Sequence, residues 1–338
     1  MSKSKEIIIA GSLVLLLIVF ASLSILKNEP VTLSYPSYWP EPTYDFSNNN
    51  LTSEGIYLGR RLFYDPILSK DSSTSCSSCH LSYTAFTHID HALSHGIQDR
   101  IGTRNSVALI NLAWNKSFMW DGAVNHLDMQ ALAPISHPSE MGESIQNVVK
   151  KLHETNHYRQ LFKQAFGDSK ITGERILKAL SQFELTLISK NSKYDSVMAN
   201  QKQFTTQESN GYLLFQNHCA DCHTEPLFTN DNFKNNGLQL DSTLNDFGRM
   251  LITSNPKDSL KFKVPTLRNI EFSAPYMHDG RFKRLSQVIN HYVDSFNAPN
   301  LSGQIVLSDT AKADLIAFLL TLSDKQFLFN SEFAYPRE

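Results

Sequence analysis

Four cysteines lie in two short clusters that share one spacing, and each cluster ends in a histidine. The clusters are Cys76-Ser77-Ser78-Cys79-His80 and Cys219-Ala220-Asp221-Cys222-His223. Two thiols one helical turn apart can add to the two vinyl groups of a haem, and the adjacent histidine can supply the proximal ligand of the iron. The spacing therefore predicts two covalently bound c-type haems, with His80 and His223 as the proximal ligands.

Two other kinds of site use closely spaced cysteines: a redox dithiol and half of a zinc site. The chain has 12 histidines among 338 residues, so a histidine follows a given cysteine by chance roughly once in 28, and both clusters together roughly once in 800. A zinc site made of the four cysteines would leave both histidines unexplained. The two-haem interpretation accounts for every one of these residues.

The composition narrows the class of protein further. The chain has 31 Lys and Arg residues against 33 Asp and Glu, a formal net charge of −2, which excludes the basic surface of a nucleic-acid-binding protein. Hydrophobic residues make up 41% of the sequence, enough for a buried core. Four cysteines are too few for a disulfide scaffold, and two haems would use all of them.

The elements that must position these clusters are predicted to be helices. Apolar residues recur at three- and four-residue spacing over 144–166, 174–189 and 310–322, which is the pattern of amphipathic helices. Gly167 is a stop signal for the first of these segments, which we expect to be interrupted near Asn156. Segments with strand-like alternation are few, so the body is predicted to be mainly α.

Four short motifs occur twice in the same order, which indicates an internal duplication. The order is G-x-x-L-F, C-x-x-C-H, R-N and M-x-D-G, and the copies begin at Gly59, Cys76, Arg104 and Met119 and at Gly211, Cys219, Arg268 and Met277. We therefore expect two cytochrome c-like haem domains in tandem, over residues 51–195 and 196–338.

The beginning of the chain predicts export. Residues 7–26 are 20 consecutive positions without a charge, and Lys3 and Lys5 precede them. Such a run is long enough to span a bilayer core. It fits an uncleaved signal anchor or a cleaved signal peptide over residues 1–26, and a buried helix is a third interpretation. Both export interpretations place the body outside the cytoplasmic membrane. Residues 27–50 are rich in proline and are predicted to be a linker.

Several ordered segments closely resemble the bacterial di-haem cytochrome c peroxidases and their MauG-like relatives. These segments are Gly102-Thr103-Arg104-Asn105, Phe118-Met119-Trp120-Asp121-Gly122, Gln130-Ala131-Leu132-Ala133-Pro134-Ile135, Pro138-Ser139-Glu140-Met141, Lys263-Val264-Pro265-Thr266-Leu267-Arg268-Asn269 and Ala274-Pro275-Tyr276-Met277-His278-Asp279-Gly280. The resemblance runs from about Leu51 to Leu322, nearly the whole exported part.

The resemblance implies roles for residues around the first haem. Glu140 matches the acidic residue above the peroxide-binding haem, and Gln130 and Pro134 match other distal-pocket positions. Trp120 matches the tryptophan that lies between the two haems, and His95 stands where some members carry a reversible distal ligand. Without the family context, these residues are ordinary: a surface acid, loop and helix-end residues, a core aromatic and a solvent-exposed histidine.

The resemblance also implies an axial ligand for the second haem and a calcium ion. Where peroxidase members have a methionine opposite the proximal histidine, this chain has Tyr292, on the apolar face of a predicted helix. Met277 is a rival ligand, and a hydrogen-bonded core tyrosine is the alternative role for Tyr292. Asn105, Ser273 and Pro275 match the positions whose oxygens hold Ca²⁺ between the domains.

The expected activity is that of a periplasmic enzyme. The resemblance implies reduction of hydrogen peroxide to water with electrons from a small cytochrome c or a similar donor, passed from the C-terminal haem to the N-terminal haem. Because a tyrosinate ligand stabilises oxidised iron, a second hypothesis is MauG-like oxidation of a protein or organic substrate. A third is a di-haem electron-transfer cytochrome without catalysis. Family members are often homodimers, and the membrane is a partner if residues 7–26 remain attached.

Overall fold

The computed structural model describes residues 30–293 and 305–337, and this part of the chain is mainly helical, as predicted. The helices are α2 (Ser53–Tyr64), α3 (Leu127–Gln130), α4 (Leu132–Ser136), α5 (Ile145–Glu154), α6 (Asn156–Phe166), α7 (Gly173–Leu185), α8 (Lys193–Met198), α9 (Thr206–His218), α10 (Met250–Thr253), α11 (Leu285–Val293), α12 (Asp309–Leu320) and α13 (Lys325–Leu328). Two short strands, β1 (Phe233–Lys234) and β2 (Phe262–Lys263), pair antiparallel with Phe233 opposite Lys263.

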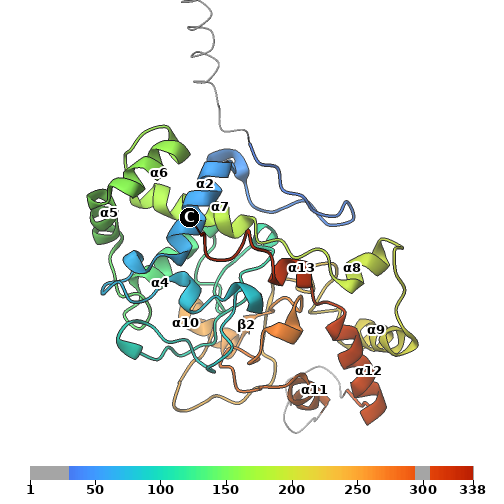
Figure 1. The fold of residues 1–338 in the computed structure, drawn as a ribbon. Helices are drawn as coiled ribbons and strands as arrows, with labels where there is room; N and C mark the ends of the chain where they lie inside the picture. Colours follow the sequence, from blue (N-terminus) through green and yellow to red (C-terminus); the bar gives the residue numbers. More distant parts are fainter. Residues whose placement is uncertain (1–29, 294–304, 338) are drawn as a thin grey trace, which may run out of the picture.

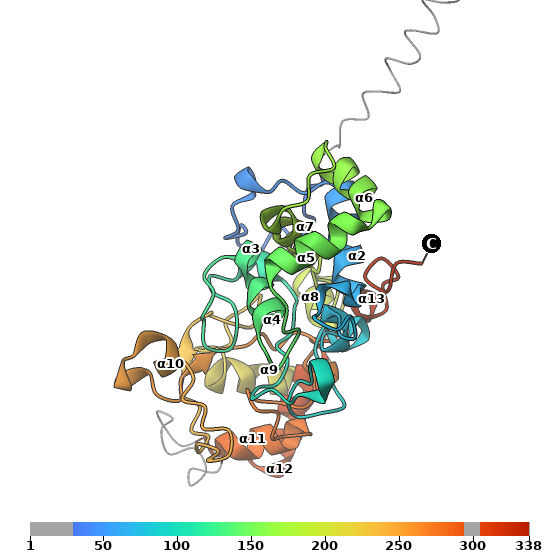
Figure 2. The ribbon, with the colours of Figure 1, turned by 90° about the vertical axis from the view of Figure 1, so that its left-hand side faces the viewer.

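The helices gather into two groups. Figures 1 and 2 show α2, α5, α6 and α7 at one end of the molecule and α9, α11 and α12 at the other. The buried hydrophobic side chains follow the same division. One cluster is built mainly from side chains between Trp39 and Leu187, and the other from side chains between Tyr194 and Leu322.

The predicted helical segments form helices with recognisable ends. The segment 144–166 is two helices, because Thr155 ends α5 and serves as the N-cap of α6. Gly167 ends α6 with a φ of 83°, a left-handed conformation that glycine adopts without a steric penalty. The segments 174–189 and 310–322 contain α7 and α12.

Each group of helices is built around one close pair. In the first pair, a Cβ on Gly59 of α2 would lie 1.8 Å from the Ala179 carbonyl oxygen of α7. In the second, a Cβ on Gly211 of α9 would lie 1.9 Å from the Asp314 carbonyl oxygen of α12. The glycine of the repeated G-x-x-L-F motif, Gly59 or Gly211, therefore lets two helix backbones come into contact in each half.

The structure corrects the alignment of one repeated motif. Asn111 and Asn269 have φ values of 55° and 58°, and each begins a 3-10 turn. Each also lies eight residues before the methionine of an M-x-D-G segment. The pairing of Arg104-Asn105 with Arg268-Asn269 is therefore wrong, because the equivalent of Asn269 is Asn111. The repeated feature is a backbone shape, which a dipeptide match does not detect.

The N-terminal part of the described chain packs against the body. Residues 30–50, within the segment expected to be a linker, place the Trp39 ring in the interior with 4% of its surface exposed. The Trp114 indole Nε1 donates to the Pro40 carbonyl at 2.7 Å. Among residues 30–293 and 305–337, no helix combines the length and apolarity needed to cross a membrane. The predicted export signal, residues 1–26, lies outside the described residues.

Candidate haem sites and the junction between them

The first C-x-x-C-H segment is a single tight turn. The backbone N–H groups of Cys79 and His80 both donate to the Cys76 carbonyl, at 3.2 and 3.0 Å. His80 Nδ1 donates to the Phe86 carbonyl at 2.7 Å, which leaves Nε2 as the ring nitrogen that can bind a metal. Burial lowers the pKa of His80 to about 4, so the imidazole is neutral at pH 7 and its Nε2 lone pair is available.

The second C-x-x-C-H segment has the same construction. The N–H groups of Cys222 and His223 donate to the Cys219 carbonyl at 3.2 and 2.9 Å. His223 Nδ1 lies 3.1 Å from both the Phe228 and the Pro265 carbonyl oxygens. Burial lowers the pKa of His223 to about 4 as well. Both turns therefore present a neutral histidine whose orientation is set by a backbone carbonyl.

The cysteines lack the character of a redox dithiol. Burial raises the pKa of Cys79 to about 11 and that of Cys219 to about 12, whereas reactive dithiols have a lowered thiol pKa. All four cysteines are partly buried, and none of them forms a disulfide. Partly buried cysteines beside a neutral histidine fit the attachment of a c-type haem, in which the thiols bond to the vinyl groups and the histidine binds the iron.

A buried carboxyl group beside the first turn also fits a haem. Glu184 of α7 is 3% exposed, and among the described residues its Oε2 has no hydrogen-bond partner. Burial, and then the charge of Asp128, raise the pKa of Glu184 to about 8, and the carboxyl group lies close enough to Cys76 to affect that thiol. An unpartnered buried polar atom is costly, so this interior is built to be completed by another group.

Glu140 lies close to the first turn. Its backbone N–H donates to the His137 carbonyl at 3.0 Å. Its charge acts to raise the pKa of the Cys79 thiol. The side chain is 34% exposed, and its Oε1 lies 3.7 Å from His137 Nδ1. Burial raises the pKa of Glu140, which is the direction expected of a carboxylate that exchanges protons near neutral pH.

Gln130 and Pro134 lie on neighbouring helices, and the structure places Pro134 beside the Glu140 segment and Gln130 beside Met119. Gln130 of α3 is 7% exposed, and its Nε2 lies 3.9 Å from the Met119 sulfur. Pro134 of α4 accepts a hydrogen bond at its carbonyl from the Met141 N–H, at 3.2 Å. This bond ties α4 to the residue that follows Glu140.

The loop that carries His95 rests on the backbone at Glu140. A Cβ on Gly96 would lie 2.3 Å from the Glu140 carbonyl oxygen, and the Cys79 thiol lies 3.4 Å from the His95 carbonyl oxygen. The His95 ring packs 4.3 Å from the His91 ring, and its Nδ1 is 2.8 Å from Asp99 Oδ1. His95 is thus near the first turn, with Nδ1 already engaged.

Trp120 lies where the two halves meet. Its Nε1 donates to the Asn105 carbonyl at 2.8 Å, and the Asn105 N–H donates to the His278 carbonyl at 2.7 Å. The Lys263 N–H donates to the Trp120 carbonyl at 2.7 Å. Hydrogen bonds therefore connect the Trp120 indole and backbone to the second half of the chain.

Sequence reasoning missed the ion-pair network at this junction. Arg104 contacts Asp121 at 2.6 Å and binds Asp246 through two nitrogens at 2.6 and 2.9 Å. In the sequence, Arg104 stands out only as part of the R-N motif. Asp246 lies 142 positions away in the sequence, and no local pattern marks it.

Asn236 contacts both candidate ligands of the second haem, Met277 and Tyr292. The Asn236 amide donates to the Met277 sulfur at 3.3 Å and interacts with the Tyr292 hydroxyl. Burial raises the pKa of Tyr292 to about 12. Cys219 and Cys222 lie near enough to Tyr292 to affect its hydroxyl, so Tyr292 is close to the second cysteine pair. Sequence reasoning gave no signal for Asn236.

The proposed calcium residues lie near the junction and among short turns. Asn105 is 6% exposed, and its side-chain amide donates to the Ala92 carbonyl at 2.9 Å. The Ser273 hydroxyl lies 3.5 Å from the Ile270 carbonyl oxygen, and Pro275 follows a cis peptide bond. Within the described ranges, no three His, Cys, Asp or Glu side chains are grouped to hold a metal ion.

Two C-x-x-C-H turns, one in each half, and a tryptophan hydrogen-bonded at the junction of the halves are the features of a di-haem c-type oxidoreductase. Comparison with known proteins agrees: a family model described as Di-haem cytochrome c peroxidase matches residues 53–203. The chain is 34% identical to the methylamine utilization protein MauG of Methylorubrum extorquens over 294 residues, which cover 84% of this chain and 82% of that protein. It is 35% identical to the cytochrome c551 peroxidase of Nitrosomonas europaea over 274 residues, covering 80% of each.

Solved structures show the same relationship. A MauG-like protein associated with microbial copper homeostasis superimposes with a TM-score of 0.82 at 31% identity, over 90% of this chain and 99% of that one. The di-haem peroxidase BthA of Burkholderia thailandensis shares the fold, with a TM-score of 0.72 at 21% identity over 91% of this chain and all of that one. The chain belongs to the di-haem cytochrome c peroxidase family, and its cofactors are two c-type haems.

Proposed function

We propose that the chain reduces hydrogen peroxide to water at the first haem, with electrons that a cytochrome c-like donor delivers through the second haem. The observation that carries this proposal is the chain of hydrogen bonds from Trp120 through Asn105 to His278, which joins the two haem-bearing halves. The peroxidases among its relatives support the same reaction.

Glu140 is proposed to move the proton in this reaction. When bound, the first haem would supply the iron that binds peroxide and the electrons that break its O–O bond. The Glu140 carboxylate, with its raised pKa, would take the proton from the near peroxide oxygen and return it to the leaving oxygen. Gln130 and Pro134 would shape the pocket. His95, whose Nδ1 lies against Asp99, would bind through Nε2 in a resting state and leave on activation.

Glu140→Gln tests this assignment, because it keeps the shape of the side chain and removes its ability to take a proton. We expect peroxide consumption with reduced cytochrome c to fall about 10²–10⁴-fold, the usual contribution of a general acid–base group. Glu174→Gln is the control, because Glu174 is exposed and pairs with Lys178 on its own helix. A rate that Glu140→Gln leaves unchanged refutes the role of Glu140.

A second function, MauG-like oxidation of a protein or organic substrate, is favoured by Tyr292. Its position beside Cys219 and Cys222 supports tyrosinate ligation of the second haem, which would stabilise oxidised iron. Tyr292→Phe and Met277→Leu separate the two ligands by optical and EPR titration. If Tyr292 is the ligand, only Tyr292→Phe changes the spectrum of the second haem; a change confined to Met277→Leu assigns the methionine.

The remaining expectations stay proposals. We infer tandem haem domains over residues 51–195 and 196–338, supported by the two glycine helix pairs and by the two core clusters, in which Tyr194, Phe327 and Leu328 lie in the opposite cluster. We also infer a periplasmic location, with residues 1–26 as the export signal or anchor. The calcium site at Asn105, Ser273 and Pro275 and a homodimer rest on the family resemblance.

A further inference from the structure

Two segments of the chain leave the two halves of the molecule along equivalent paths. We call residues 186–198, which follow α7, the first arm, and residues 321–333, which follow α12, the second arm. The Asn111 N–H donates to the Leu187 carbonyl at 2.8 Å, and the Ser189 N–H donates to the Asn111 side chain at 2.9 Å. Asn269 makes the same two bonds, with the Leu322 carbonyl at 3.1 Å and the Asp324 N–H at 2.7 Å.

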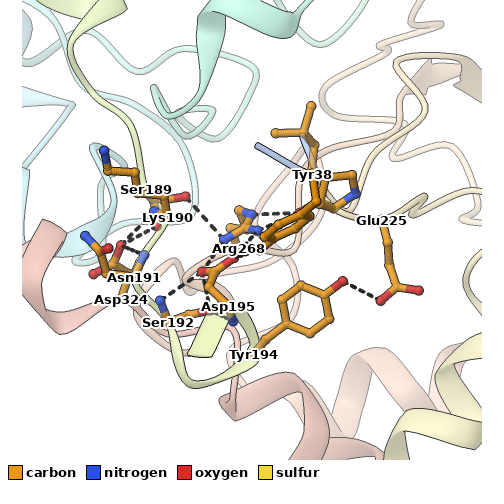
Figure 3. A network of polar contacts seen from close by, with 12 residues as sticks. Tyr38, Ser189, Lys190, Asn191, Ser192, Tyr194, Asp195, Glu225, Arg268 and Asp324 are labelled. Carbon is orange, nitrogen blue, oxygen red and sulfur yellow. Dashed lines mark hydrogen bonds and ion pairs between the residues drawn. The ribbon is translucent and has the colours of Figure 1, made fainter. Parts of the chain in front are cut away.

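The two arms meet in the interior. Asp324 Oδ2 accepts hydrogen bonds from the Ser189 hydroxyl at 3.3 Å and from the backbone N–H groups of Lys190 and Asn191 at 2.9 and 2.8 Å. Ser189 and Asp324 are both 0% exposed. Figure 3 shows the Asp324 carboxylate turned toward the first arm. The arms therefore pass one another in a buried contact held by at least these three hydrogen bonds.

Beyond this meeting point, each arm packs into the opposite half. Tyr194 of the first arm is 2% exposed and belongs to the second core cluster, where its ring centroid lies 4.8 Å from that of Phe228. Phe327 of the second arm is 3% exposed and belongs to the first cluster, where its ring centroid lies 6.0 Å from that of Phe86. The ends of the two halves are exchanged.

The residues that the arms contact are those whose carbonyls hold the histidines. Phe86 accepts the hydrogen bond of His80 Nδ1, and Phe228 shares with Pro265 the hydrogen bond of His223 Nδ1. Both phenylalanines have a left-handed backbone, with φ values of 57° and 55°. A bulky residue keeps such a conformation only where its surroundings hold it, and the aromatic ring of an arm is part of those surroundings.

We propose that Phe327 and Tyr194 are positioning residues that act across the two halves. Phe327 sets the His80–Phe86 hydrogen bond, and Tyr194 sets the His223–Phe228 hydrogen bond. Hydrogen bonding at Nδ1 raises the basicity of Nε2, so each half tunes the iron ligand of the other. The proposal rests on the assignment of His80 and His223 as proximal ligands.

The test is Phe327→Ala in the full-length protein carrying both haems. Weakening the His80–Phe86 bond makes the imidazole a poorer electron donor, which favours reduced iron. We expect the midpoint potential of the first haem to rise by at least about 59 mV, which is a tenfold change in its one-electron redox equilibrium. The midpoint potential of the second haem should stay unchanged. EPR-monitored reductive titration resolves the two haems, and resonance Raman should show a weaker iron–histidine bond in the first alone.

Matched variants separate positioning from a general loss of packing. Phe329→Ala is the control, because Phe329 follows the same helix and is 64% exposed; it should move neither potential. Phe327→Leu keeps an apolar side chain and should shift the first haem less, in the same direction, and it serves if Phe327→Ala yields no holoprotein. Tyr194→Ala should shift the second haem only. Tyr194→Phe keeps the ring but loses the 2.6 Å hydrogen bond to Glu225. This variant should restore the parent potential of the second haem.

The outcomes distinguish this inference from the proposed function. A parent protein with fewer than two haems, or without histidine ligation, overturns the proposed sites themselves. If the parent has two histidine-ligated haems and Phe327→Ala shifts both equally, the second alone, or neither, the exchange of positioning residues is overturned while the sites stand.

Discussion

Replacing Arg104 by methionine removes the charge that holds two buried carboxylates at the junction. Arg104 lies 2.6 Å from Asp121 and binds Asp246 through two nitrogens at 2.6 and 2.9 Å. The two acidic side chains are only 9% and 5% exposed. Methionine has a similar length and no charge, so the variant leaves two carboxylates buried without a cation.

The structure sets the size of the expected loss. Breaking a buried pair by removing one partner usually costs about 3–5 kcal/mol, because an uncompensated charge remains. Each carboxylate keeps one backbone hydrogen bond, from Ala123 N–H to Asp121 at 3.0 Å and from Gly248 N–H to Asp246 at 2.9 Å. We therefore expect the free energy of unfolding at pH 7 to fall by about 3 kcal/mol, the lower end of that range.

The pH dependence should have a definite sign. Burial acts to raise the pKa of Asp246, but the hydrogen bond and charge of Arg104 outweigh it and hold the pKa below its usual value. In the parent, the ion pair with Asp246 therefore stabilises the fold at pH values above the pKa of an unfolded aspartate. This stabilisation is lost as pH falls through the lowered pKa of the folded state. Without Arg104, burial raises the pKa, so the variant gains stability on protonation. The difference between parent and variant should shrink from pH 7 to pH 5.

The assay is urea unfolding of the holoprotein at both pH values, since guanidinium salts screen ion pairs. Arg175→Met is the matched control, because Arg175 also pairs with an aspartate at 2.6 Å, but Asp168 is 59% exposed. Its effect should be much smaller, since solvent screens an exposed pair. A loss below about 1 kcal/mol for Arg104→Met at pH 7, or a loss that grows at pH 5, refutes the reasoning.

Three further perturbations have expected outcomes. Gly211→Ala places a Cβ 1.9 Å from the Asp314 carbonyl oxygen, so it should cost about 3 kcal/mol or more, and an unchanged thermal midpoint contradicts the close packing. Burial raises the pKa of Glu184 to about 8, so this residue destabilises the fold as pH rises from about 4 toward 8. Glu184→Gln should therefore stabilise the protein at pH 8 more than at pH 5 in urea unfolding. A gain in stability that does not depend on pH contradicts this. Trp120→Phe removes the donor to the Asn105 carbonyl. It should slow electron transfer between the haems, measured by stopped flow, and leave the optical spectra of both haems unchanged. Kinetics like those of the parent exclude Trp120 from the electron-transfer route.

The sequence by itself determined the features that depend on residues a few positions apart: the haem-attachment turns, the helices and the close helix contacts. The C-x-x-C-H turns follow from spacing, because hydrogen bonds to the first cysteine carbonyl place the thiols and the histidine on one turn. The helices follow from apolar periodicity, and the glycine of G-x-x-L-F marks a helix contact in both halves. The two haems could be predicted from the C-x-x-C-H spacing, and the family from the ordered segments that resemble it.

The tertiary structure decided what depends on residues far apart in the chain. Arg104 meets Asp246 across 142 positions, and Phe327 and Tyr194 pack into opposite halves. The R-N repeat was misaligned because a dipeptide carries no record of its backbone shape, which Asn111 and Asn269 share. Short-range rules act through backbone bonds over a few residues, whereas burial and pairing depend on which surfaces the whole chain brings together. The sequence therefore determined where the haems attach, and the fold alone brought Phe327 and Tyr194 beside the phenylalanines whose carbonyls accept the histidine hydrogen bonds.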